Sequence, residues 1–223
     1  MPQNSRAFIF DAYGTLFDVH SVVMRGEHGL ACNPQALSAL SDLWRRKQLE
    51  YTWLLALMER FEDFRKITRA SLRASIGQLG IQADEAQLER LMDAYLSPFA
   101  FPEVKSALED LGSVPMAILS NGTAEMVGAA VSNSGLTSCF EHVISVDRVG
   151  TYKPSPRVYA LGPEILNIPA AEMLFVSSNA WDAAGAKAYG YQVCWCNRSG
   201  AEPDHMGFVP DFTVTQLDQI SRL

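Results

Sequence analysis

Three polar residues stand where short apolar runs end. Asp11 closes the first run of the chain, Ser120 closes "MAILS" and Ser177 closes "MLFVS". Apolar runs of this length are typical of buried strands, and a parallel sheet binds its ligands beyond the carboxyl ends of its strands. We therefore expect these three side chains to lie on one rim of a sheet.

Three more polar residues are expected on the same rim. Asn179 and Asp182 follow the last of these runs within one turn, and Lys153 lies in the loop after "HVISV". The rim would thus gather a lysine, an amide and two carboxylates from separate parts of the chain. Such a set can perform acid–base, nucleophilic or ligand-binding chemistry.

Asp11 is the centre of that expectation. A strand-end aspartate can be a nucleophile, a general base or a metal ligand, but it can equally cap a turn. The polar residues expected around Asp11 favour a catalytic role, because Lys153 would stabilise the ionised carboxylate. Ser120, Asn121 and nearby backbone amides would supply donors for an anion.

Strands and helices alternate through most of the chain. The predicted strands span Ala7–Asp11, 116–120, 142–146, 173–177, 191–196 and 211–214, and the predicted helices between them span 103–111, 123–134, 156–166 and 182–189. Near-continuous apolar strands separated by helices indicate a parallel sheet that is covered on both faces. The predicted fold class is α/β, with a Rossmann-like doubly wound parallel sheet core.

A helical block interrupts this alternation after the first strand. Asn33-Pro34 is typical of a helix start, and Asp84–Gln87 reads as a capping box. Residues 18–97 contain no convincing strand, so we predict a block of helices inserted over 18–97. The catalytic core would then consist of residues 1–17 and 98–223.

Composition narrows the function classes. The chain has 223 residues and a net charge of −7, which argues against nucleic acid and anionic membranes as partners. Its N-terminus does not resemble a signal peptide, and its longest apolar stretch, residues 51–58, is too short to cross a bilayer. Cys194 and Cys196 face the same way along a predicted strand, where apolar packing is favoured over a metal site. We expect a cytoplasmic protein.

Four motifs carry a family resemblance. "DAYGTL" (11–16), "LSNG" (119–122), "YKP" (152–154) and "SSNAWD" (177–182) resemble, in order, the four motifs of the haloacid dehalogenase superfamily. Its phosphatases have a second aspartate two residues after the nucleophile and extra acids in the fourth motif. This chain has Tyr13 and "SSN" at those places, and it resembles instead the L-2-haloacid dehalogenase branch. Further matching runs are "FDVHSVV" (17–23) and "LWRRKQLEYTWL" (43–54), and the helical insert over 18–97 resembles the four-helix cap of the family.

The resemblance implies a mechanism and a set of site residues. Asp11 would displace the halide from a small 2-haloalkanoic acid, and water would hydrolyse the aspartyl ester to an inverted 2-hydroxy acid, without cofactor or metal. Halide needs no proton to leave, which makes Tyr13 understandable in place of an acid. The implied residues are Arg45, Asn121 and Trp181 around the halide, and Ser120 with the amides of Ala12 and Tyr13 around the substrate carboxylate. Lys153 would neutralise Asp11, Thr15 and Tyr159 would support the site, Ser177 is among the catalytic residues of the fourth motif, and Asn179 and Asp182 would position or activate the hydrolytic water. The pocket walls would be Tyr13, Leu49, Phe64 and Trp181.

Two alternatives remain open from the sequence: a Mg²⁺-dependent phosphatase of the same fold, and a non-catalytic protein that binds a carboxylate metabolite. Arg46 is expected on the surface. The helix around Trp53 is apolar nearly all round, so we expect it to be covered by a second subunit in a homodimer.

Overall fold

Six parallel strands form the central sheet of the computed structural model, which describes residues 5–223. The strand order is β5-β4-β1-β6-β7-β8. The bounds are β1 Ala7–Phe10, β4 Met116–Ser120, β5 His142–Ser145, β6 Met173–Ser177, β7 Gln192–Cys196 and β8 Phe212–Val214. Every residue of β1, β4 and β6 is buried, as expected for a sheet covered on both faces. The predicted α/β class is confirmed.

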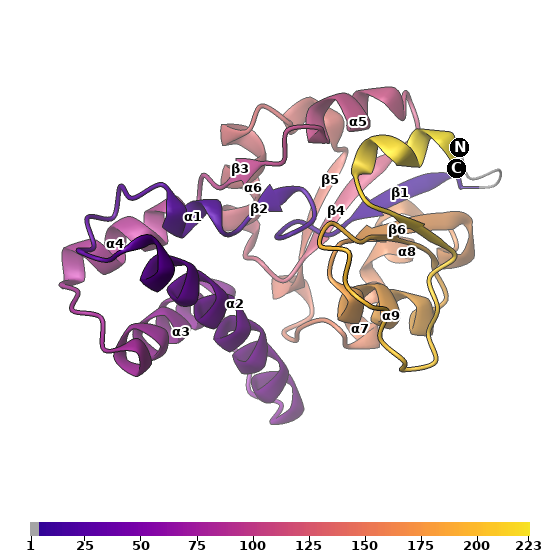
Figure 1. Cartoon of the computed structure of the whole chain (residues 1–223). Helices are drawn as coiled ribbons and strands as arrows, with labels where there is room; N and C mark the ends of the chain where they lie inside the picture. Colours follow the sequence, from indigo (N-terminus) through magenta and orange to yellow (C-terminus); the bar gives the residue numbers. More distant parts are fainter. Residues whose placement is uncertain (1–4) are drawn as a thin grey trace.

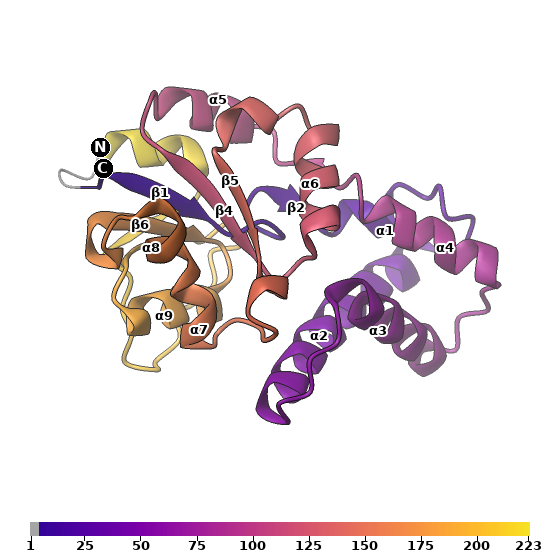
Figure 2. The same cartoon turned by 180° about the vertical axis from the view of Figure 1, so that it is seen from behind.

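Helices cover both faces of this sheet (Figures 1 and 2). They are α5 (Val104–Asp110), α6 (Ala124–Asn133), α7 (Pro156–Tyr159), α8 (Leu161–Leu166) and α9 (Ala180–Tyr189), with 3-10 helices at Thr137–Cys139, Val146–Arg148, Ala170–Glu172 and Leu217–Arg222. The single helix expected over 156–166 is two short helices. Pro163 follows the break and has no N–H to donate, so the hydrogen-bond ladder cannot run through unbroken.

The helical cap projects to one side of the sheet (Figure 1). It comprises α1 (Ser21–Met24), α2 (Pro34–Leu57), α3 (Phe64–Leu79) and α4 (Glu85–Ala94). Asn33 caps α2 by accepting a hydrogen bond from the Ala36 amide at 2.8 Å. Asp84 and Gln87 form the predicted capping box at the start of α4.

A two-stranded ribbon joins cap and core, and the sequence reading missed it. β2 (Phe17–Asp18) pairs antiparallel with β3 (Phe99–Ala100). The expected boundary at 17/18 lies inside β2, and the one at 97/98 lies just before β3. Strands of two residues carry no readable periodicity, which explains the omission.

The two sides of α2 differ in burial. Trp44, Gln48 and Thr52 are buried at a four-residue spacing, as for one face of a helix that packs against α3. Near its C-terminus Leu57 is 82% exposed.

No helix within residues 5–223 has the length and apolar character needed to span a membrane.

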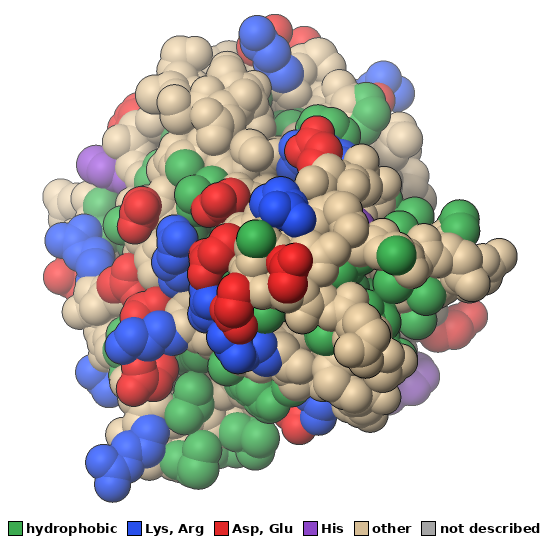
Figure 3. Space-filling view, turned by 90° about the vertical axis from the view of Figure 1, so that its left-hand side faces the viewer, with side chains coloured by type: hydrophobic (Ala, Val, Ile, Leu, Met, Phe, Trp, Pro, Cys, Tyr) green, Lys and Arg blue, Asp and Glu red, His purple; other side chains and the backbone are tan. Residues whose placement is uncertain are grey.

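The outer face of the cap carries acidic and basic side chains side by side (Figure 3). Arg69 and Arg73 of α3 both pair with Glu85 of α4, at 2.8 and 2.6 Å. Arg46 is exposed, as predicted.

Cys194 and Cys196 lie in β7 of the central sheet, and both are fully buried. Burial raises the pKa of the Cys194 thiol to about 12. Their expected place in apolar packing is confirmed.

Candidate active site

The Asp11 carboxylate is held by three donors at the carboxyl end of β1. Its Oδ1 accepts from Lys153 Nζ at 3.1 Å, and its Oδ2 accepts from Thr15 Oγ1 at 2.9 Å and Asn179 Nδ2 at 2.8 Å. The residue is only 6% exposed. Three donors thus satisfy and orient the two oxygens of this buried carboxylate.

Lys153 lies between two carboxylates. It is fully buried, and its Nζ donates to Asp182 Oδ2 at 2.8 Å as well as to Asp11. Burial alone would lower the pKa of Lys153, but the charges of Asp11 and Asp182 outweigh it, so the pKa is raised. The ammonium therefore stays charged and balances one of the two carboxylates.

Asp182 is the deepest acid of the site. Its Oδ1 accepts from the Tyr159 hydroxyl at 2.7 Å, and it has no solvent exposure. Burial, followed in effect by the attraction of Lys153 and the repulsion of Asp11, shifts the pKa of Asp182, and the net direction is upward. Burial also raises the pKa of Tyr159 well above its usual value, so this phenol stays a donor.

Local hydrogen bonds position Thr15 and Asn179. Thr15 Oγ1 accepts from the Ser178 amide at 2.8 Å, which ties the loop after β1 to the loop after β6. Ser177 Oγ accepts from the Asn179 amide at 3.1 Å and so shapes the turn that begins α9. Ser177 thus supports Asn179 and makes no side-chain hydrogen bond to Asp11.

The cap reaches this site through Arg45. Its Nη2 donates to the Tyr13 carbonyl at 3.3 Å, and Asn179 Nδ2 donates to the same carbonyl at 3.2 Å. Its Nη1 donates to Gln48 Oε1 at 2.8 Å. A guanidinium from α2 is thereby fixed against the loop that carries Asp11.

Aromatic rings close the cap over the core. Tyr13 stacks on Phe64 with ring centroids 6.1 Å apart and lies 5.4 Å from the ring of Tyr95. Burial is the main cause that raises the pKa of Tyr13, and its hydroxyl has no hydrogen-bond partner among the described residues. A Cβ at Gly122 would come within 2.8 Å of the Tyr13 ring, so only glycine fits there.

The expected anion-binding groups follow β1 and β4. Ser120 is buried and its Oγ accepts from the Gly122 amide at 3.1 Å, while Asn121 Oδ1 accepts from the Lys153 amide at 3.0 Å. Within residues 5–223 the backbone amides of Ala12 and Tyr13 donate to no protein group. Two free N–H groups beside the nucleophile suit a carboxylate ligand.

The two remaining expected residues, Leu49 and Trp181, make no side-chain hydrogen bond within the described chain. Leu49 is half-buried one turn after Arg45 on α2. Trp181 packs edge-on against Trp53, with centroids 5.5 Å apart, and both indole N–H groups are buried without a partner in the described chain. Trp53 and Trp181 border a cavity of about 440 Å³ between α2 and the loop at Thr151–Ser155.

Sequence reasoning missed the groups that surround the expected residues. Gln48 accepts from Arg45 inside the cap, and the Tyr95 hydroxyl donates to the same Gln48 oxygen. Phe175 lies under the Lys153 ammonium, which is 4.9 Å from its ring centroid. The i, i+3 spacing of Arg45 and Gln48 was a usable signal, because such residues are neighbours on a helix. Nothing in the sequence pointed to Tyr95.

The donor set does not fit a divalent cation. Mg²⁺ needs carboxylate or carbonyl oxygens. At the place where the superfamily's phosphatases have an acid, Asn179 turns its NH₂ group towards Asp11, and Lys153 occupies the other carboxylate oxygen. No cluster of three or more His, Cys, Asp or Glu side chains lies within residues 5–223.

Comparison with known proteins agrees with this geometry. The family model of haloacid dehalogenase-like hydrolases matches residues 5–190. The chain is 47% identical to haloacetate dehalogenase H-2 of Moraxella sp. (strain B), over 97% of its length and 96% of that protein. It is 44% identical to the (S)-2-haloacid dehalogenase of Pseudomonas sp. (strain YL), over 98% and 94%.

A solved structure shows the same architecture. The L-2-haloacid dehalogenase from Xanthobacter autotrophicus with chloropropionic acid covalently bound superposes with a TM-score of 0.90, at 39% identity and 98% coverage of each chain. The chain therefore belongs to the haloacid dehalogenase-like hydrolases, and within them to the L-2-haloacid dehalogenases.

Proposed function

We propose that this protein hydrolyses short-chain (S)-2-haloacids to (R)-2-hydroxy acids and halide through a covalent ester on Asp11. The observation that carries the proposal is the setting of Asp11: a buried carboxylate with three donors, beside Tyr13 in place of a second acid. The likeness to 2-haloacid dehalogenases along nearly the whole chain supports the substrate class.

In the first step an Asp11 oxygen attacks C2 of the substrate from the side opposite the halogen. The carbon–halogen bond breaks as the carbon–oxygen bond forms, and the electron pair leaves with the halide. Ser120 and the free amides of Ala12 and Tyr13 would hold the substrate carboxylate. This placement fixes the enantiomer, because only one keeps the halogen in line with Asp11.

Positive charge and polar donors would receive the halide. Arg45, Asn121 and Trp181 are proposed for this role, and Arg45 already contacts the loop of the nucleophile. Leu49, Phe64 and the ring of Tyr13 would wall the substrate and exclude water. A halide leaves without a proton, so the reaction needs no acid at position 13, and the Tyr13 phenol, whose pKa is raised, can stay neutral.

In the second step water attacks the carbonyl carbon of the ester, and the oxygen that was originally on Asp11 leaves with the product. Asn179 would position the water, and Asp182, whose pKa is raised, would accept its proton. C2 is inverted once, in the first step. Lys153, Thr15 and Tyr159 would hold the carboxylates throughout, and Ser177 would hold the Asn179 backbone.

Halide release tests the proposal. (S)-2-Chloropropionate should yield chloride and (R)-lactate in the presence of EDTA, and the R enantiomer should yield none. Cleavage of phosphate esters only with Mg²⁺, and no halide release, would favour the phosphatase alternative. Absence of both activities with measurable carboxylate binding would favour the binding protein.

Isotope labelling tests the ester. After one turnover in H₂¹⁸O, mass spectrometry should find the label in the peptide that contains Asp11. Turnover that leaves this peptide unlabelled would show that water attacks the substrate directly.

We further propose that the protein is a cytoplasmic homodimer. The end of α2 exposes Leu54, Leu57 and Met58 together, which is the kind of apolar patch that a partner covers. The four cysteines are free thiols, in keeping with a reducing compartment. Sedimentation of wild type and Leu57→Lys tests the dimer, since the charge should shift it to monomer.

A further inference from the structure

We propose that Gln48 is a positioning residue for the reaction: its neutral amide fixes Arg45 without neutralising the guanidinium. The inference rests on the proposed function, in which Arg45 receives the leaving halide. Gln48 itself touches neither the substrate nor the halide.

The contacts of Gln48 join three parts of the cap. Its side chain is fully buried on the face of α2 that packs on α3. Oε1 accepts from Arg45 Nη1 at 2.8 Å and from the Tyr95 hydroxyl at 3.2 Å. Nε2 donates to Thr68 Oγ1 at 2.8 Å.

These partners allow only one orientation of the amide. Arginine has donors and no acceptor, so the amide must present its oxygen to Arg45. The Thr68 hydroxyl donates to the Phe64 carbonyl at 2.6 Å, which leaves its lone pairs to accept from Gln48 Nε2. A locked amide in turn locks the guanidinium.

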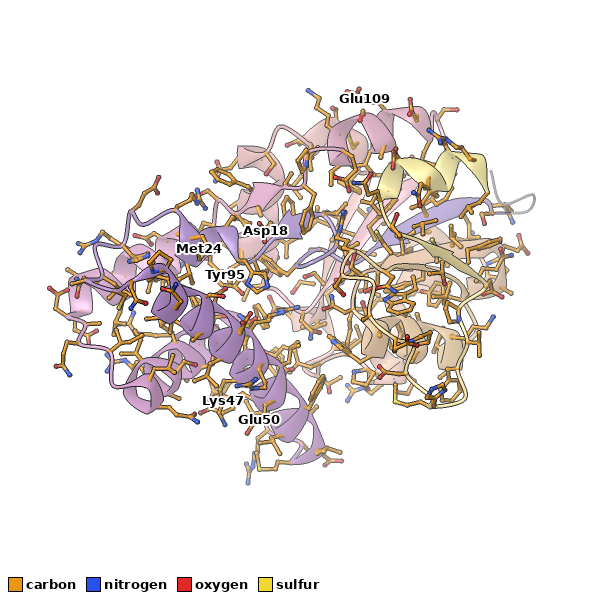
Figure 4. All side chains as sticks on the ribbon, in the orientation of Figure 1. Asp18, Met24, Lys47, Glu50, Tyr95 and Glu109 are labelled. Carbon is orange, nitrogen blue, oxygen red and sulfur yellow. The ribbon has the colours of Figure 1, made fainter. Side chains whose placement is uncertain are left out.

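The neutrality of this holder matters because a carboxylate there would pair with Arg45. Two residues away on the same helix, Lys47 has such a partner at the same spacing: its Nζ lies 2.9 Å from Glu50. Lys47 and Glu50 lie along the outer edge of α2, whereas Tyr95 lies between the cap helices and the core (Figure 4). None of the ion pairs among residues 5–223 includes Arg45.

A guanidinium without a carboxylate partner has its full positive charge available to stabilise the halide that forms during the reaction. Charge placed in advance where negative charge develops lowers the barrier, and a nearby carboxylate would cancel much of it. The Arg45–Gln48 pair therefore supplies orientation and leaves the charge available.

The first test compares leaving groups. For Gln48→Leu, kcat/KM for (S)-2-chloropropionate should fall about tenfold, the usual cost of a lost hydrogen bond to a charged group. The loss for (S)-2-bromopropionate should be smaller, because bromide leaves more readily and needs less stabilisation. Equal losses for the two substrates would overturn the proposal.

Ser75→Ala is the matched control. Ser75 is also buried in the cap and its Oγ donates to the Ser71 carbonyl at 2.8 Å, but it has no link to Arg45. In Ser75→Ala, the ratio of kcat/KM for (S)-2-chloropropionate to kcat/KM for (S)-2-bromopropionate should equal that of the wild type.

The second test keeps the proposal falsifiable if Gln48→Leu does not fold. In Gln48→Glu the new carboxyl mimics the amide when protonated and pairs with Arg45 when ionised. The ratio of variant to wild-type kcat/KM should therefore rise as the pH falls. A ratio that stays constant with pH, or equals one throughout, would contradict a role for neutrality.

A double-mutant cycle separates positioning from general damage. In an Arg45→Ala background, Gln48→Leu should cause little further loss with the bromo substrate, because the residue that it positions is gone. Additive losses would overturn the proposal. Failure of the proposed function is distinguishable, since the wild type would then release no halide at all.

Discussion

The core and the cap each direct one charged group at the same substrate, and they hold it by different means. In the core, the buried Asp11 carboxylate shares Lys153 with a second buried carboxylate, Asp182. In the cap, Arg45 is held by the neutral groups of Gln48 and the Tyr13 carbonyl. The core thus pairs its nucleophile with an opposite charge, whereas the cap orients the Arg45 guanidinium with neutral acceptors and leaves its charge unpaired.

This difference follows from what each group must do. A nucleophile has to stay ionised in a site that excludes water, and a buried carboxylate needs a cation for that. A group that receives a leaving anion must keep its positive charge free until the anion forms. We therefore expect removal of charge balance in the core to damage folding and activity together, and changes at Arg45 to damage activity more than stability.

The largest effect is expected for Asp11→Asn. The amide nitrogen is not a nucleophile, so kcat/KM for (S)-2-chloropropionate should fall by about 10³-fold or more, as is typical when a covalent nucleophile is removed. Halide release measured by ion chromatography checks this. Activity within tenfold of wild type would remove Asp11 from the mechanism.

Lys153→Met should damage folding as well as activity. It leaves two buried carboxylates without a cation, and breaking such a pair costs about 3–5 kcal/mol in the free energy of unfolding. Urea denaturation at neutral pH measures that loss. A loss below about 1 kcal/mol, the range of exposed ion pairs, would mean that the core does not depend on charge balance.

The pH dependence of stability should also change in this variant. The pKa of Lys153 is raised in the folded wild type, so its contribution is complete below the unfolded lysine pKa of about 10.4 and is lost as the pH rises through the folded value. That alkaline loss should disappear in Lys153→Met. The variant should instead gain stability as the pH falls from neutral, because the pKa of Asp182 is raised even with the lysine present.

Arg45→Ala should affect activity more than stability. Arg45 is half-buried and held only by neutral groups, so unfolding should change by about 1 kcal/mol. kcat/KM should fall about 10²-fold, as for removal of one group that stabilises developing charge. Denaturation and halide-release assays on the same preparation test this; a stability loss as large as that of Lys153→Met would erase the contrast between cap and core.

The core was more readable from sequence than the cap. Asp11, Ser120 and Ser177 end apolar strands, and parallel strands bring such ends together, so period and position alone placed them. The expected strand ended one residue late, at Asp11, because the last residue of a strand and the first of its loop look alike in sequence.

The surroundings of Arg45 could not be predicted because they depend on how separate helices pack. Gln48, Thr68 and Tyr95 come from α2, α3 and the end of α4, and helical period shows which face is buried without showing which residues meet. The i, i+3 spacing of Arg45 and Gln48 was the available signal. It shows that the two side chains are neighbours on α2, but not which residues of other elements meet them.

The smallest effect is expected on the outer face of the cap, where charges are also paired but exposed. Glu85 accepts from Arg69 and Arg73 and is 61% exposed. Glu85→Gln should lower the free energy of unfolding by less than about 1 kcal/mol, because water screens such pairs, and kcat/KM should not change. The stability difference should shrink further in 1 M NaCl, where the Debye length is only about 3 Å. Thermal denaturation at low and high salt measures it, and a salt-independent loss of several kcal/mol would show that these pairs resemble the buried charges of the core.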